Sequence, residues 1–200
     1  MNKQRSGKVS ESPDNQSIRK KYERYSVTGF YQQFGDDYRN PHEPAINRMI
    51  QLAVQKWPLD LQKVLDLACG SGEVTLALHN LGYDNIDGID PYTYNAYWQR
   101  TGKKAETYSF EDIGTGMLWG RYYSLIICSF ALHLLSASRL PIVAYHLSTI
   151  ADSLVIITPH KRPHLQPEWG WQYRDELVLD SVRSRFYVSS QRHVDPEACK

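Results

Sequence analysis

The sequence has no apolar run long enough to cross a membrane. The longest one, residues 124–135, spans about a dozen residues, whereas a membrane-spanning helix needs about 20. We therefore expect a buried strand, or the extension of one, there. The polar N-terminus resembles no signal peptide, so the sequence predicts a cytoplasmic protein with no membrane partner.

Cysteine is scarce, and so is net charge. The three cysteines are odd in number and lack paired spacing, which predicts reduced thiols rather than disulfides or a zinc site. His160 and His164 have the spacing of a metal half-site, but Pro163 between them prevents a helix, and we expect no metal. The net charge of +1 gives no overall attraction to nucleic acid.

The chain of 200 residues fits one domain. Residues 1–20 are rich in polar and poor in apolar residues, which predicts a flexible tail, and 191–200 resemble a second tail. We expect 21–190 to form a single domain. Its first part, 21–58, is rich in aromatic residues and ends in an amphipathic helix over 43–56.

Apolar runs alternate with helical patterns through the middle of the chain. Strands are predicted over 63–67, 85–89, 104–108, 123–129 and 153–158, and helices over 73–81, 92–101 and 136–152. This order is typical of an α/β protein with a Rossmann-like, doubly wound, mostly parallel sheet and helices on both faces. Residues 177–190 are predicted to form one long strand or a hairpin. About thirty residues follow Gly170, which is short for a helix and two strands, so we expect the last strand to be reduced or missing.

A glycine-containing turn follows the first predicted strand, with the sequence Val-Leu-Asp-Leu-Ala-Cys-Gly-Ser-Gly at residues 64–72. Glycines let the backbone bend sharply and let a nucleotide approach it at the start of a helix. A dinucleotide-binding turn would have a third glycine where Thr75 stands, and Glu73 would repel a pyrophosphate. A phosphate-binding loop ending in Gly-Lys-Ser/Thr is absent. The turn therefore favours a ligand with positive charge and no phosphate.

Asp90 ends the second predicted strand, about twenty residues after the turn. An acidic side chain at this position can accept hydrogen bonds from both ribose hydroxyls of a nucleoside. Asp90 followed by Pro91 is also good capping chemistry for the next helix, and both roles can hold together.

Residues 60–160 resemble the class I S-adenosylmethionine-dependent methyltransferases. Residues 64–72 resemble their first motif, Asp90 their ribose-binding acid, 110–112 the segment beside the adenine, and 122–133 their fourth-strand motif. The resemblance implies S-adenosylmethionine as cofactor, S-adenosylhomocysteine as product and a seven-stranded sheet. The cofactor-binding residues that it implies are Asp66, Ala68, Cys69, Gly70, Ser71, Gly72, Asp90, Pro91, Phe110, Glu111, Cys128, Ser129 and Phe130. The sequence departs from the family pattern at Ala68, usually glycine, and at Ser124, often an acid.

Two histidines are candidate catalytic bases, because oxygen acceptors often lose a proton during methyl transfer. His133 and His160 follow the fourth and fifth predicted strands, where ligands bind in such sheets. The apolar surroundings of His133 also fit a purely structural histidine. His160 precedes Lys161 and Arg162 on a loop that either binds an anionic acceptor or is simply solvated.

Aromatic side chains on either side of the predicted sheet are candidate substrate contacts. Tyr31 and Tyr38 belong to the N-terminal segment, which we interpret as a lid over the cofactor or as a helix packed on the sheet. Trp169 and Trp171 follow the fifth strand.

Small-molecule methylation is the leading hypothesis, because the charge is near neutral and no added recognition domain is visible. Residues 129–132 lack the motif of adenine methylases, and Cys128 lacks the adjacent proline of cytosine C5 methylases. The basic residues at 19–24 and 161–162 leave RNA or protein methylation open as an alternative. A non-catalytic adenosylmethionine-binding protein is a third possibility, and the oligomeric state stays open.

Overall fold

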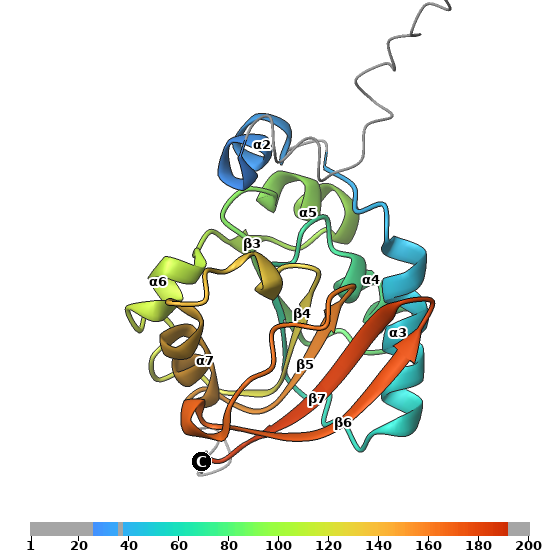
Figure 1. Ribbon diagram of the computed structural model, residues 1–200. Helices are drawn as coiled ribbons and strands as arrows, with labels where there is room; N and C mark the ends of the chain where they lie inside the picture. The colour runs from blue at the N-terminus through green and yellow to red at the C-terminus, as the bar shows by residue number, and fades with distance from the viewer. Residues whose placement is uncertain (1–25, 36–37, 192–200) are drawn as a thin grey trace, which may run out of the picture.

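A computed structural model of the chain describes residues 26–35 and 38–191. These residues contain one seven-stranded sheet with the order β3-β2-β1-β4-β5-β7-β6 (Figure 1). The strands are β1 (Val64–Leu67), β2 (Ile86–Ile89), β3 (Ala105–Glu106), β4 (Tyr123–Ser129), β5 (Ala151–Thr158), β6 (Trp171–Leu179) and β7 (Val182–Ser189). Strands β1 to β5 pair in parallel, and β7 is antiparallel to both of its neighbours. The predicted mostly parallel sheet is confirmed.

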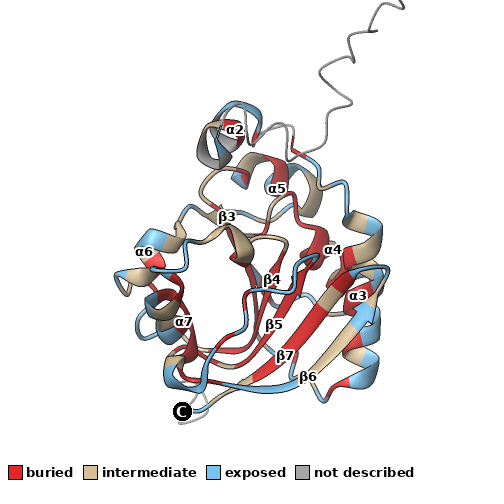
Figure 2. Cartoon of the chain, in the orientation of Figure 1, coloured by how far each residue is buried: buried red, intermediate tan, exposed pale blue. Residues whose placement is uncertain are grey.

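Helices cover both faces of the sheet, as predicted. They are α2 (Val27–Phe34), α3 (Glu43–Lys56), α4 (Glu73–His79), α5 (Tyr94–Thr101), α6 (Phe110–Gly114) and α7 (Leu140–Ser148), with 3-10 turns η3 (Leu132–Leu134) and η4 (Pro167–Trp169). Because strand side chains alternate, Leu125 and Ile127 of β4 pack with α3 and α4, whereas Ile126 and Cys128 pack with α6 and α7. Tyr97 of α5 packs beside α4. Figure 2 shows β4 and β5 as buried strands at the centre.

The C-terminal strands differ from the expectation. Strands β6 and β7 have nine and eight residues, so the prediction of a reduced last strand is wrong. The connection between β5 and β6 is shortened instead: within 38–191 it contains no α-helix, and only η4 lies between the two strands. Trp171, the first residue of β6, packs beside α7. Its surface is 0% exposed, and its indole N–H donates to the carbonyl of Ala144 in α7 at 2.8 Å. Strands β6 and β7 form a hairpin, which Asp180 and Ser181 turn with positive φ angles of 47° and 68°.

Two local elements are set by contacts that the apolar pattern did not reveal. Helix α7 is shorter than the predicted 136–152 at both ends: it begins at Leu140 with Pro141 in its first turn, and β5 already begins at Ala151. Helix α6 was not predicted, and a capping box starts it. The Ser109 hydroxyl accepts from the Asp112 backbone N–H at 3.2 Å, and the Asp112 carboxylate accepts from the Ser109 N–H at 2.8 Å.

The predicted N-terminal tail and the basic residues at 19–24 lie outside the described residues, as do 192–200 of the predicted C-terminal tail. Among the residues that are described, no helix combines the length and the apolarity needed to cross a membrane.

Candidate functional site

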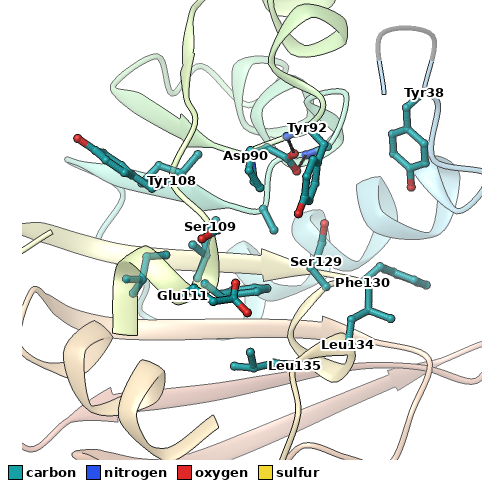
Figure 3. Close-up of a pocket in the computed structure, with 18 of the residues that line it drawn as sticks. Tyr38, Asp90, Tyr92, Tyr108, Ser109, Glu111, Ser129, Phe130, Leu134 and Leu135 are labelled. Carbon is teal, nitrogen blue, oxygen red and sulfur yellow. Dashed lines mark hydrogen bonds between the residues drawn. The ribbon is translucent and has the colours of Figure 1, made fainter. Parts of the chain in front are cut away.

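A cavity of about 500 Å³ lies at the carboxyl ends of β1, β2 and β4. Ligands bind at this edge in doubly wound sheets, because the loops after parallel strands diverge there. The predicted residues that line it are Tyr38, Ala68, Gly70, Asp90, Pro91, Phe110, Glu111, Ser129 and Phe130. Figure 3 shows Asp90 and Tyr92 on one side of the cavity and Phe130, Leu134 and Leu135 on the other.

The turn after β1 bends through left-handed backbone at Gly70 and Gly72, with φ angles of 56° and 89°. A Cβ atom at Gly70 would lie 3.2 Å from Glu73 Oε2 and 3.4 Å from the Tyr38 ring, so glycine keeps this part of the cavity open. At Gly72 a Cβ would lie only 2.6 Å from Thr101 Cγ2. Gly72 therefore serves the close approach of α5 rather than contact with the cavity.

Other predicted residues around the turn divide into lining and buried positions. Ala68, which stands where the family usually has glycine, lines the cavity with a φ of 55°. Cys69, Ser71 and Cys128 are buried and are not among the lining residues. Burial raises the pKa of both thiols, that of Cys128 to about 12, so neither cysteine is a ready nucleophile.

Asp90 connects the turns after β1 and β2. Its Oδ2 accepts from the backbone N–H of Gly70 at 3.2 Å, and its Oδ1 accepts from those of Tyr92 and Thr93 at 2.9 and 3.0 Å. Burial raises the pKa of Asp90, and these hydrogen bonds partly offset the rise. In the described part of the chain, Oδ2 has one hydrogen-bond partner, the Gly70 N–H, and can accept another, so the capping role leaves room for a ligand.

Asp66 is fully buried and is not among the lining residues. Its Oδ2 accepts from the N–H and the hydroxyl of Thr75 at 3.1 and 2.7 Å, which ties β1 to α4. Burial, together with the charge of nearby Glu73, raises the pKa of Asp66 well above its usual range. Oδ1 has no hydrogen-bond partner among the described residues.

Glu73 lines the cavity, although the predicted set of site residues does not include it. Its Oε1 accepts hydrogen bonds from the Ser71 hydroxyl, from Arg100 Nη1 at 3.0 Å and from the Asn40 N–H at 3.4 Å. Arg100 also pairs with Glu43 at 2.5 Å. A carboxylate directly after the glycine turn is the signal that could have identified Glu73. Nothing local in the sequence points to Arg100, which comes from α5.

The wall near β3 is formed by Tyr108, Phe110 and Glu111. The resemblance expects this segment to flank an adenine, and Phe110 and Glu111 do line the cavity. Glu111 forms an ion pair with Arg139 from the start of α7, and both side chains are more than half exposed. Arg139 lines the same cavity.

The segment before α3 reaches the cavity from the side opposite α6. Tyr38 and Asn40 line it. The His42 ring stacks on Phe130, with ring centroids 4.7 Å apart and an interplanar angle of 15°. Phe130 directly follows β4 with a φ of 53°. The backbone of Tyr31 lies in α2, but its side chain is outside what the structure describes.

The two candidate bases lie together at the ends of β4 and β5. The rings of His133 and His160 are 4.4 Å apart at an angle of 53°, and neither residue lines the cavity. Burial, with a smaller contribution from His160, lowers the pKa of His133 to about 4. His160 is exposed, and buried Arg185 donates to its carbonyl and to those of Lys161 and Pro163. Arg185 therefore holds the loop after β5.

The tryptophan candidates lie apart from the cavity. Trp171 is fully buried, and Trp169 packs against the core on the α7 side. The wall that the sequence analysis missed is apolar: Leu134 and Leu135 follow β4, within the run that the sequence assigned to a continuing strand. Within the described part of the chain, no three His, Cys, Asp or Glu side chains gather as a metal site.

Comparison with known proteins gives one relative by sequence and many by fold. No family model matches the chain. An uncharacterized protein of the fission yeast Schizosaccharomyces pombe is 31% identical over 218 aligned residues, covering 82% of this chain and 88% of the relative. The magnesium protoporphyrin IX methyltransferase of Synechocystis, solved with bound S-adenosylmethionine, matches with a TM-score of 0.58 at 17% identity over 91% of this chain and 100% of that chain. A ribosomal protein methylase of Lactobacillus delbrueckii matches with a TM-score of 0.54 at 14% identity, over 77% and 81% of the two chains.

Proposed function

The chain belongs to the same family as the fission-yeast protein and has the class I methyltransferase fold, and on this premise we propose that it is an S-adenosylmethionine-dependent methyltransferase acting on a small molecule. The cofactor supplies an activated methyl group. The chain would hold donor and acceptor at attack distance and exclude water from them.

The observation that supports this proposal best is the charge around the cavity. Glu73 and Asp90 line it beside the glycine turn, and Arg139, the one basic residue among the described lining residues, is paired with Glu111 on the far wall. A dinucleotide would bring its pyrophosphate to the glycine turn, where the Glu73 carboxylate would repel it. S-adenosylmethionine has no phosphate and carries an ammonium and a sulfonium, so it suits the residues present.

We assign the ribose to Asp90, whose Oδ2 has acceptor capacity left. The adenine would lie between Pro91 and the wall of Tyr108 and Phe110, and the amino-acid end beside the glycine turn. Asp66 would act indirectly, by holding β1 against α4.

The acceptor would enter over the carboxyl end of β4. Leu134, Leu135 and Phe130 make that wall apolar and Tyr38 adds an aromatic contact, which favours a small, partly apolar molecule. His133 and His160 remain proposed bases for an acceptor that extends past η3 to reach them. Trp169 and Trp171 are better explained as packing residues.

RNA is the second candidate, because Lys161 and Arg162 are exposed on the loop that Arg185 holds. The two solved relatives act on a porphyrin and a ribosomal protein according to their names, so the fold leaves the acceptor open. A cytoplasmic location stays a prediction.

Titration calorimetry with S-adenosylmethionine, S-adenosylhomocysteine and NAD tests the proposal directly. We expect binding of the first two and none of NAD. A preference for NAD, or no binding of either adenosyl compound, would overturn the proposed function. A metabolite screen with methyl-labelled cofactor would then identify the acceptor, and steep salt dependence of acceptor binding would favour RNA instead.

A further inference from the structure

The carboxylate of Glu73 is held by one oxygen only. Within the described ranges, its three hydrogen-bond donors are Ser71, Arg100 and Asn40, and all of them meet Oε1. No donor among the described residues meets Oε2. That oxygen lies on the Gly70 side, 3.2 Å from where a Cβ of Gly70 would stand. Because Glu73 lines the cavity, the oxygen without a partner is the one beside the open turn.

Among the described residues, the ion pairs that involve Glu73 leave an excess of negative charge. Arg100 is shared by two carboxylates, at 3.0 Å from Glu73 and 2.5 Å from Glu43, which leaves one negative charge. The Glu43 side chain is 38% exposed and is stabilised by water, whereas that of Glu73 is 3% exposed. A carboxylate with so little access to water is stabilised by a positively charged partner, and Glu73 reaches solvent only through the cavity that it lines, so the cavity favours a ligand with a positively charged donor at this point.

The neighbouring carboxylates have other roles. Asp90 accepts three backbone N–H groups, and Asp66 is tied to Thr75 behind the turn. Glu73 differs from both because the Arg100 guanidinium donates to its Oε1 and so fixes the orientation of the carboxylate. Arg100 therefore orients Oε2 toward the turn without forming a hydrogen bond to it.

We propose that Glu73 binds the ammonium group of the cofactor's amino-acid end through Oε2, and that Arg100 is its positioning residue. This inference rests on the proposed function and deepens it. An ammonium fits the oxygen better than a sulfonium does, because only the ammonium donates hydrogen bonds. The Asn40 N–H on Oε1 links the same carboxylate to the segment that carries Tyr38.

The test compares ligands with and without the amino-acid end. S-adenosylmethionine and S-adenosylhomocysteine contain the ammonium, and 5′-methylthioadenosine lacks that whole end. In Glu73→Gln we expect calorimetric affinity to fall about 20-fold for the first two and to change by less than about twofold for the third. Asp90→Ala is the matched control, because it should weaken all three ligands.

A second measurement needs no change in the protein and therefore does not depend on variant folding. Wild-type protein should bind the deaminated analogue of S-adenosylhomocysteine, in which hydrogen replaces the ammonium, about 20-fold more weakly than S-adenosylhomocysteine itself. Equal affinities would overturn the assignment of Oε2 to the ammonium.

The role of Arg100 is tested by rescue. Arg100→Met should weaken S-adenosylmethionine about tenfold and spare 5′-methylthioadenosine, and Arg100→Lys should recover part of the loss, because an ammonium can still pair with Glu73. If wild type binds all three ligands but Glu73→Gln weakens all equally or none, this inference is wrong and the proposed function stands. If wild type binds none of them, both are wrong.

Discussion

The two sides of the cavity differ in which parts of the chain form the wall. On the donor side, after β1 and β2, the wall consists of backbone turns and buried carboxylates, and Asp90 alone accepts three backbone N–H groups. On the acceptor side, after β4, the wall consists of projecting side chains such as Leu134, Leu135 and Arg139. Backbone geometry tolerates few substitutions, whereas side chains can be exchanged without moving the sheet. This explains how one fold can keep its donor while its members differ in acceptor.

The largest effect is expected on the donor side, from Asp90→Ala. Loss of the carboxylate removes the acceptor of three backbone N–H groups and the proposed ribose contact, so S-adenosylmethionine should bind about 100-fold more weakly, or by about 2.7 kcal/mol. Calorimetry measures the affinity, and thermal melting shows whether the turn still folds. Asp84→Ala, at a side chain that is 84% exposed, is the control. A loss below about fivefold for Asp90→Ala would contradict the donor-side assignment.

Gly72→Ala tests whether the turn depends on close backbone approach. Its Cβ would meet Thr101 at 2.6 Å, and we expect a loss of about 2–4 kcal/mol in the free energy of unfolding. Gly82 is a matched control, because it has the same φ of 89° and nothing within 4 Å. Gly82→Ala should cost only the backbone strain of about 1–2 kcal/mol. Equal losses in urea unfolding would show that the approach of α5 does not matter.

On the acceptor side, His133 should make stability depend on pH. Burial and His160 lower its pKa from 6.5 to about 4. Between these two pH values, His133 is protonated in the unfolded chain and neutral in the folded protein. Stability from this group is present above pH 6.5 and is lost as pH falls toward 4. In His133→Gln, the free energy of unfolding, measured with urea at several pH values, should depend less on pH in this window. His160→Gln should reduce the slope by a smaller amount, because it removes only the lesser cause, and an unchanged slope in both variants would contradict the coupling.

The smallest effect is expected from the loop after β5. The double variant Lys161→Gln, Arg162→Gln removes two exposed charges that belong to the acceptor side. We expect the calorimetric affinity for S-adenosylmethionine to change by less than about twofold. A tenfold loss would break the division into donor and acceptor sides, while weaker binding of a mixed-sequence RNA would support the RNA alternative.

Much of the donor side could be predicted because its signals are local. The glycine turn, Asp90 and the alternation of strands and helices depend on residues close together in the sequence. The parallel pairing of β1 to β5 and the lining of the cavity by Gly70 and Asp90 agree with these signals. The length argument failed for the last strand, because within 38–191 the chain has no α-helix between β5 and β6, and the residues saved there form two full strands. Nothing in the spacing of apolar residues distinguishes these two ways of shortening a chain.

The sequence by itself determined the fold class and the chemistry of the turn, because periodicity and glycine positions act through neighbouring residues. Only the tertiary structure decided that Glu73 lines the cavity and that Asp66 is buried behind the turn. Arg100 pairs Glu43 with Glu73 across 57 and 27 positions of sequence, and His133 meets His160 across the ends of two strands. Contacts between distant residues depend on how the helices pack on the sheet, and that packing is settled by the whole core rather than by any one segment.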